Sequence, residues 1–290
     1  MDLASSYVDL GAVLASHPEA KAFEDEIAAM CDRAETVVHG SSLASTPNPQ
    51  QPHLLAPVGR QECWGAGCTY RVDDGLSQMR KKRPLYAAIY EADRPMLFFK
   101  GNAFRVAGPG DSIACRRGAR QTIPEAELAV LFGPTGQPVA YALSNDVTAL
   151  DLEQANPLYQ PQAKVFDGSV ALGPWWTPLA VAPDALSTTF SCEVLRDGAT
   201  VLRQQIDPGR LVRSVEELGR RLFEATSFPH GVVLMTGGGA PVPSGFTLVG
   251  GDTVVITHPQ LGELRNRVRS SDSKIPVICE GTNYQHAARI

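Results

Sequence analysis

Residues 124–146 read PEAELAVLFGPTGQPVAYALSND, and this stretch decides the fold. Two apolar runs of strand length flank a turn-rich hexapeptide at 133–138. Glycine and proline in such a position between apolar runs are typical of a β-hairpin. We therefore predict an antiparallel hairpin in which Phe132 pairs with Val139.

This register brings three carboxylates together. Asp146 falls opposite Glu125, and Glu127 shares the face of Glu125 because side chains two residues apart on a strand point the same way. Three like charges at close range repel strongly unless their pKa values rise or a cation is present. Oxygen ligands with open coordination positions suit Mg²⁺ or Mn²⁺ better than Zn²⁺. The alternative is a solvent-facing acidic edge on the hairpin, because Glu-x-Glu is a common pattern. The register is an assumption, and a slip of one residue would turn the faces over.

The remainder of the chain has the texture of a β-rich globular protein. Its 290 residues are 43% hydrophobic, which is enough to bury a core without staples. After residue 58, short apolar runs rich in β-branched and aromatic residues alternate with Gly, Pro and Asp turns. Helices are predicted at 18–35 and 213–226.

The polar, proline-rich stretch 41–53 is the best linker candidate. We therefore divide the chain into a small N-terminal domain with its linker at 1–57 and a main domain at 58–290. The six cysteines show no zinc-ligand spacing, so we expect reduced thiols.

The charge balance argues against nucleic acid as a partner. The formal net charge is −5, so no basic surplus is present to neutralise phosphates. No apolar run approaches the ~20 residues that a membrane-spanning helix needs, and the start of the chain does not resemble a secretory signal. We expect a cytoplasmic protein with no nucleic acid and no membrane as partners.

Motifs along the chain resemble the fumarylacetoacetate hydrolase family. The family pattern is Glu-x-Glu on one strand, followed by Asn-Asp-Val-[Ser/Thr]-Ala-Arg-Asp, and this sequence reads PEAEL at 124–128 and NDVTALDLE at 145–153. The similarity continues through RPMLFFK at 94–100, VAGPGDSI at 106–113, NPLYQPQAK at 156–164, FDGSVALGP at 166–174, MTGGGAPVP at 235–243 and GDTVVITHPQLGELRNRV at 251–268.

Within the family, NPLYxPQAK and WGxGxxY are similar to the branch that contains 2-keto-3-deoxy-D-arabinonate dehydratase. The resemblance implies an α+β, β-rich fold, the family's mixed β-roll with a small N-terminal domain. It also implies Mg²⁺ (or Mn²⁺) on Glu125, Glu127 and Asp146, a small-molecule 2-oxo acid as substrate, and a homodimer or homotetramer.

The resemblance implies roles for five further residues. Lys164 faces the substrate and transfers a proton or stabilises an oxyanion, and we expect a pKa lowered into a useful range. Thr236, Gly237 and Tyr70 bind the substrate, the first through its hydroxyl and the nearby backbone N–H groups. Lys100 supports the metal-binding carboxylates from behind.

Three positions depart from the family pattern. Asp73 stands where hydrolases of the family carry a histidine three residues after the position of Tyr70, which weakens C–C hydrolysis. Met96 replaces a glutamate that the dehydratase branch usually has, and Leu150 replaces an arginine. These two changes leave the acid/base of the reaction open.

The sequence therefore predicts a metal-dependent lyase that dehydrates a 2-keto-3-deoxy sugar acid or a related 2-oxo acid through a metal-chelated enolate. The alternatives are a C–C bond hydrolase of acylpyruvate type, an oxaloacetate-type decarboxylase, and a catalytically altered paralogue that binds 2-oxo acids. The dehydratase, the hydrolase and the decarboxylase would all use a cation that the carboxylate and keto oxygens of the 2-oxo acid chelate.

Overall fold

Three β-sheets form the body of the protein in the computed structural model, which describes residues 9–34, 47, 53–71, 81 and 84–271. The strands are β1 Glu62–Gly67, β2 Met96–Asn102, β3 Val106–Ala107, β4 Ser112–Ala114, β5 Thr122–Ile123, β6 Ala126–Phe132, β7 Pro138–Asp146, β8 Thr148–Ala149, β9 Val170–Pro178, β10 Phe190–Arg196, β11 Ala199–Ile206, β12 Val232–Met235, β13 Thr253–His258 and β14 Gly262–Arg269.

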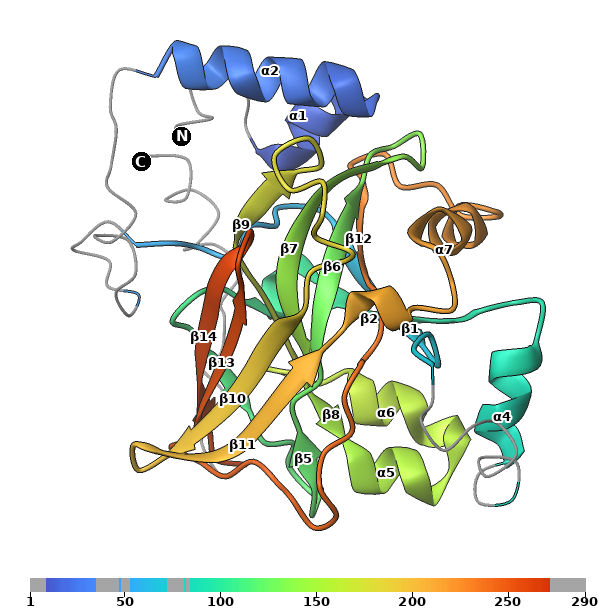
Figure 1. Ribbon diagram of the computed structural model, residues 1–290, viewed down its shortest axis with the longest axis vertical. Coiled ribbons are helices and arrows are strands. Elements are labelled where there is room, and N and C mark those ends of the chain that lie inside the picture. The colour runs from blue at the N-terminus through green and yellow to red at the C-terminus, as the bar shows by residue number, and fades with distance from the viewer. Residues whose placement is uncertain (1–8, 35–46, 48–52, 72–80, 82–83, 272–290) are drawn as a thin grey trace.

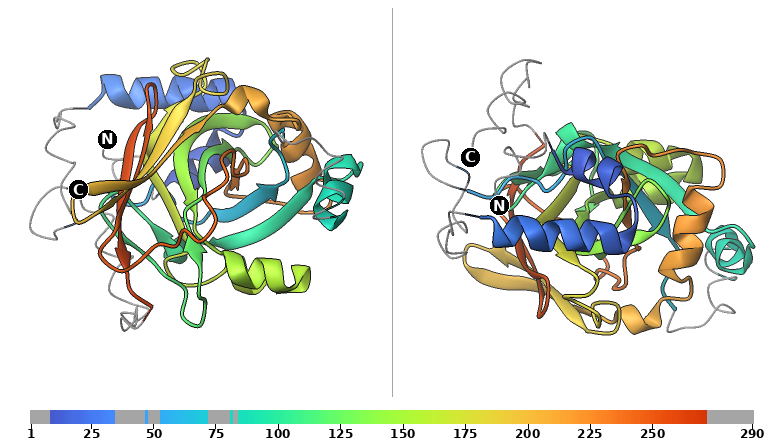
Figure 2. Two further views of the ribbon diagram at one scale, coloured as in Figure 1. Left: turned by 60° about the horizontal axis from the view of Figure 1, so that its bottom comes forward. Right: turned by 90° about the horizontal axis from the view of Figure 1, so that it is seen from above.

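The sheets mix parallel and antiparallel pairs. A seven-stranded sheet has the order β2-β1-β12-β6-β7-β9-β3, a five-stranded sheet has the order β11-β10-β13-β14-β4, and β5 pairs with β8. The large sheet curls around a central interior, and the five-stranded sheet packs beside it (Figures 1 and 2). The predicted α+β, β-rich class is confirmed.

Short helices close the ends of this body. The α-helices are α1 Leu10–Ser16, α2 Ala20–Asp32, α4 Pro84–Glu91, α5 Leu150–Ala155, α6 Gln160–Lys164 and α7 Val215–Leu222, and the 3-10 helices are η3 Ala103–Arg105, η4 Pro157–Tyr159 and η5 Pro208–Arg210. In Figure 1, α1 and α2 lie across one end of the large sheet, whereas α5 and α6 lie near the other end.

The two helices predicted from sequence are confirmed as α2 and α7, each shorter than predicted. Helix α7 begins after Ser214, whose hydroxyl accepts a hydrogen bond from the N–H of Glu217 at 3.1 Å. Such a side-chain cap satisfies a backbone donor that the first turn leaves unpaired. Among the described residues, none of the helices has both the length and the apolar character that a bilayer crossing requires.

The hairpin of β6 and β7 has the predicted register where the carboxylates lie. The N–H of Asp146 donates to the carbonyl of Glu125 at 2.9 Å. The predicted pair of Phe132 with Val139 is wrong, because a β-bulge pairs Phe132 with Pro138 instead. The bulge is confined to the turn end of the hairpin, so it leaves the far end in register.

Both faces of β6 are covered. Leu128 and Val130 belong to the core between the seven-stranded sheet and the five-stranded sheet. Ala129 and Leu131 point the other way, into the interior of the curl, which side chains of α1 and α2 fill at one end. Because side chains alternate along a strand, Glu127 faces the same interior as Ala129, toward the end away from α1 and α2.

The curl brings distant strands together. Strand β2 is separated from β7 by β1, β12 and β6 in the sheet, yet Lys100 of β2 forms an ion pair with Asp146 of β7. Likewise, a Cβ added to Gly101 of β2 would lie 3.8 Å from Val170 of β9. Side chains of β2 therefore reach across the interior to the carboxylates.

The predicted small N-terminal domain, residues 1–57, includes helices α1 and α2. Helices α1 and α2 share an apolar core with the large sheet, to which Phe23 and Val139 both belong. The candidate linker 41–53 lies outside the described residues except for residues 47 and 53. The boundary after residue 57 stays a prediction.

Candidate metal centre and active site

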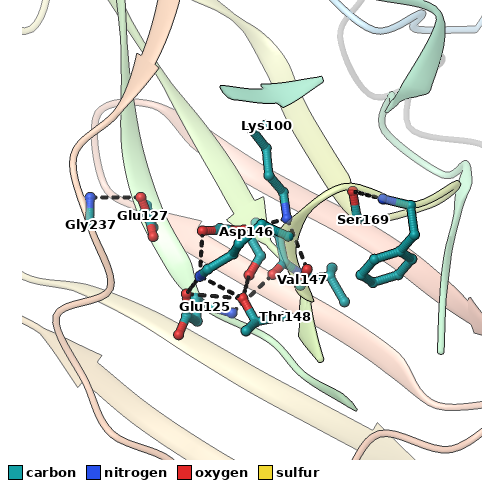
Figure 3. Close-up of polar contacts among 11 residues, drawn as sticks. Lys100, Glu125, Glu127, Asp146, Val147, Thr148, Ser169 and Gly237 are labelled. Atoms are coloured by element: carbon teal, nitrogen blue, oxygen red, sulfur yellow. Dashed lines mark hydrogen bonds and ion pairs between the residues drawn. The ribbon is translucent and has the colours of Figure 1, made fainter. Parts of the chain in front are cut away.

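Three carboxylates meet at the end of the curl away from α1 and α2. Glu125 directly precedes β6, Glu127 lies within it, and Asp146 ends β7. One oxygen from each lies within 4.8 Å of the others. Glu127 and Asp146 are each 1% exposed, so this cluster is not a solvent-facing acidic edge. The three side chains therefore converge as the hairpin register predicts (Figure 3).

Each carboxylate is held by a fixed donor. The N–H of Gly237 donates to Glu127 Oε2 at 2.7 Å, as Figure 3 shows. Lys164 Nζ donates to Glu125 Oε2 at 2.6 Å and to Asp146 Oδ2 at 2.8 Å. These bonds orient the acids toward one another despite their mutual repulsion.

Two buried lysines supply the countercharge. Lys100 is fully buried, forms an ion pair with Asp146 Oδ1, and donates to the carbonyl of Val147 at 2.9 Å. Lys164 ends α6, is 4% exposed, and lies 5.3 Å from the ring centroid of Phe98. With all five groups ionised, three negative charges against two positive charges leave one negative charge in a buried site.

The pKa values show where this balance fails. Burial raises the pKa of Glu125, and burial together with the charges of Asp146 and Glu125 raises the pKa of Glu127 well above its usual value. Burial also opposes the charged form of Asp146, but the two lysines outweigh it and lower its pKa. Two of the three acids therefore lack sufficient positive charge.

The lysines divide in the same way. Burial lowers the pKa of Lys100, although Asp146 opposes the change. For Lys164 burial alone would lower the pKa, but Asp146 and Glu125 outweigh it and raise the pKa well above its usual value. The expectation that the pKa of Lys164 is lowered is wrong for this site, because the same carboxylates that would bind metal hold its ammonium.

The donor set fits a hard divalent cation. All three candidate ligands are carboxylate oxygens, which Mg²⁺ and Mn²⁺ prefer, and no cysteine or histidine of the described residues joins this cluster. Such an ion would offset the charges of Asp146 and Glu125, which add to burial in raising the pKa of Glu127. Glu125, Glu127 and Asp146 are the residues that would hold it.

A sequence model described as "Fumarylacetoacetate (FAA) hydrolase C-terminal" matches residues 63–269. The chain belongs to the fumarylacetoacetate hydrolase family. This match covers all three acids and both lysines of the site. It confirms the family that the sequence motifs indicate.

Two relatives within the family carry dehydratase names. The chain is 34% identical over 217 residues to a probable 2-keto-3-deoxyxylonate dehydratase of Haloferax volcanii. The matched region covers 74% of this chain and 75% of the relative. It is 30% identical over 226 residues to the 2-dehydro-3-deoxy-D-arabinonate dehydratase of Saccharolobus solfataricus, which covers 74% of each chain.

A solved structure shares the fold. It is described as 2-keto-3-deoxy-D-arabinonate dehydratase complexed with magnesium and 2,5-dioxopentanoate. The TM-score is 0.74 at 30% identity, with 82% of this chain and 83% of that chain covered. The predicted fold of the fumarylacetoacetate hydrolase family is therefore confirmed.

The residues predicted to bind substrate lie beside the acids. Thr236 is buried directly after β12, and its hydroxyl donates to the carbonyl of Leu128 at 3.0 Å. Gly237 holds Glu127 through its N–H. Tyr70 is 5% exposed, and burial together with the charge of Glu127 raises its pKa. Contact between these residues and a substrate stays a prediction.

The sequence interpretation did not identify two side chains that contact Lys164. Thr148 accepts a hydrogen bond from its ammonium, and the ring of Phe98 lies beside it. Both had a signal in the sequence. Thr148 belongs to the NDVT motif, and Phe98 alternates with Lys100 and Met96, so the three share one face of β2.

One ionisable side chain on α5 also acts on the site. The charge of Glu153 raises the pKa of Lys164 and that of Glu125. Met96, which replaces the family's glutamate, brings no such charge. Its side chain packs over Gly67 of β1, where an added Cβ would lie 2.8 Å from the Sδ of Met96. Asp73, the residue in place of the family's histidine, lies outside the described residues.

Proposed function

We propose that this chain is a Mg²⁺-dependent dehydratase, a hydro-lyase, that acts on a 2-keto-3-deoxy sugar acid or a related 2-oxo acid. The observation that carries the proposal is the convergence of three buried carboxylates with Lys164 at one end of the curled sheet. The dehydratase names of the relatives and the magnesium in the solved structure support it.

Loss of water requires two proton movements. One proton leaves C3 of the substrate, the bond between C4 and its hydroxyl oxygen breaks, and the hydroxyl takes up a proton to leave as water, which gives a C3=C4 double bond conjugated with the 2-oxo group. For a pentonate, a proton then leaves C5 and one is taken up at C3, and the resulting enol tautomerises to the 5-oxo group of 2,5-dioxopentanoate. A bound divalent cation supplies a Lewis acid that polarises the 2-oxo group. The protein must then place a proton-carrying group beside C3 and C4.

Lys164 is our candidate for that group. The residue is 4% exposed and its ammonium is oriented by hydrogen bonds, so it enters the site with little conformational freedom. A protonated amine in this position is suited to stabilise a developing oxyanion, and it would donate a proton only where a bound cation weakens its bonds with Glu125 and Asp146, which raise its pKa. Because the site is buried, bulk water does not compete for the same positions.

The surrounding residues have supporting roles in this proposal. Lys100 fixes the rotamer of Asp146, and Gly237 fixes that of Glu127. Thr236 precedes the Gly237 that binds Glu127, and the charge of Glu127 acts on Tyr70, so in this proposal the two residues offer hydroxyls and backbone donors to a substrate carboxylate.

The test is turnover by the purified protein. Incubation with Mg²⁺ and 2-dehydro-3-deoxy-pentonates should release 2,5-dioxopentanoate, and a chelator should stop the reaction. Glu125→Ala should abolish turnover, whereas Asp25→Ala, which removes an exposed acid of α2, should not. Pyruvate release from acylpyruvates, or CO₂ from oxaloacetate, without dehydration would assign the same site to a hydrolase or a decarboxylase.

We also propose a cytoplasmic homodimer or homotetramer, on the resemblance to the family alone. Light scattering coupled to gel filtration measures the mass in solution. A monomer of 31.1 kDa at micromolar concentration would contradict the assembly.

A further inference from the structure

The hydroxyl of Thr148 contacts both the ammonium of Lys164 and the carboxylate of Glu125. Lys164 Nζ donates to Thr148 Oγ1 at 2.7 Å, in addition to its bonds with Glu125 and Asp146. A lysine ammonium has three N–H donors, so these three acceptors use all of them. Of the three, Thr148 is the uncharged acceptor.

A bound cation would weaken the hydrogen bonds that Lys164 forms with the other two acceptors, Glu125 and Asp146. Glu125 and Asp146 are candidate metal ligands, and a carboxylate that coordinates a divalent ion has less charge to offer an ammonium. Repulsion between the cation and Lys164 acts in the same direction. The hydroxyl of Thr148 is outside this competition, because it is not one of the clustered acids.

The orientation of the hydroxyl is fixed by its surroundings. Thr148 is 0% exposed, and its strand β8 is held by pairing with Ile123 of β5. Its own proton has two acceptors nearby, the carbonyl of Asp146 at 2.9 Å and Glu125 Oε2 at 3.2 Å. Since Lys164 has no acceptor of its own, a lone pair of Oγ1 must face its ammonium.

We propose that Thr148 is a positioning residue that keeps the amine of Lys164 directed at the substrate once a cation occupies the three carboxylates. The inference rests on the proposed function and deepens it. Figure 3 shows Thr148 beside Glu125 and Asp146, on the side where the hydrogen bonds converge. Without the hydroxyl, the ammonium would lose the partner that a cation does not weaken.

Three variants separate the hydroxyl from the methyl group. Thr148→Ala removes both, and Thr148→Ser restores only the hydroxyl. Thr122→Ala is the matched control, because Thr122 is a buried threonine of the paired strand β5 and its Oγ1 accepts from the N–H of Arg116 at 3.2 Å. For each protein we would measure kcat and KM, the Kd for Mg²⁺ by calorimetry, and the crystal structure with Mg²⁺.

We expect kcat of Thr148→Ala to fall about tenfold or more, since misplacing a reacting group by about 1 Å can cost up to about 100-fold. KM and the Mg²⁺ Kd should stay within about twofold, because the hydroxyl is not a ligand. Thr148→Ser should recover most of kcat, and Thr122→Ala should keep it. In the Mg²⁺-bound crystal of Thr148→Ala, the amine of Lys164 should be displaced.

Other results would overturn the inference. Wild-type kcat in Thr148→Ala, or an equal loss in the serine variant, would leave the hydroxyl without a positioning role. A loss of Mg²⁺ affinity that accounts for the loss of kcat would make Thr148 part of the metal site. If the wild-type protein dehydrates no 2-oxo acid, the proposed function fails, and the position of Lys164 in the two crystals still tests the role of Thr148.

Discussion

The ion pair between Lys100 and Asp146 tests the electrostatics of the site most directly. Lys100 is 0% exposed and Asp146 is 1% exposed, and the carbonyl of Val147 accepts a second bond from the same amine at 2.9 Å. The perturbation is Lys100→Met, which keeps a long unbranched side chain and removes the charge. Within the part of the chain that the structure describes, Lys164 is then the one cationic partner left to Asp146.

The magnitude follows from burial. Breaking a buried ion pair by removing one partner costs about 3–5 kcal/mol, because an uncompensated charge remains. Lys164 still compensates part of the charge of Asp146, so we expect about 3 kcal/mol, the lower end of that range. Neutralising Lys21, whose pair with Asp25 is exposed to solvent, should have little effect.

The assay is urea unfolding of the metal-free proteins, with Lys21→Met as the matched control. Saturating Mg²⁺ should reduce the deficit of Lys100→Met, since the variant site carries one more net negative charge for the cation to offset. A midpoint of unfolding for Lys100→Met at the same urea concentration as for the wild-type protein would refute the reasoning. So would a deficit that grows when Mg²⁺ is added.

Three further predictions concern single residues. Glu127→Gln keeps an acceptor for the N–H of Gly237 but removes a ligand, so calorimetry should detect no Mg²⁺ binding, and retained binding would contradict the ligand set. Gly237→Ala should lower the melting temperature, because its φ of +107° disfavours a side chain and the added Cβ would overlap Thr69 Oγ1; an unchanged melting temperature would speak against this. Burial lowers the pKa of His258, whose Nδ1 accepts from the N–H of Gln260 at 3.0 Å. The unfolded chain therefore binds a proton that the folded protein resists, so stability should fall as pH drops below about 6.5, by at most about 1.4 kcal/mol per pH unit for this group. His258→Gln should flatten that part of the pH profile in chemical unfolding, and an unchanged slope would assign it to other groups.

The hairpin was predictable because its information is local. A turn-rich hexapeptide between two apolar runs sets the pairing of β6 with β7, and strand alternation then places Glu125, Glu127 and Asp146 together. The bulge after Leu131 was not predictable from this pattern, because the turn chooses between neighbouring registers by backbone geometry. The error did not reach the acids, since it affected only the turn end.

The residues around the acids depend on the curl of the sheet, which no local pattern encodes. Alternation along β2 predicts that Met96, Phe98 and Lys100 share a face, but it does not say what that face meets. Only when the large sheet bends does Lys100 reach Asp146 across three intervening strands. The sign of the pKa change at Lys164 depends on where α6 packs, because that packing brings its ammonium within hydrogen-bond distance of Glu125 and Asp146.

The curl of the large sheet also explains why a divalent cation would suit this site better than further lysines. The interior of the curl is filled by apolar side chains at the end near α1 and α2, so each further charge at the other end must be desolvated. Lys100 already shows that cost, because burial lowers its pKa even beside Asp146. A third buried lysine would incur the same penalty and supply one charge, whereas a divalent ion supplies two charges and leaves open positions for ligand oxygens. The architecture therefore favours three acids and two lysines, an incomplete neutralisation that a divalent ion and a 2-oxo acid would complete under the proposed function.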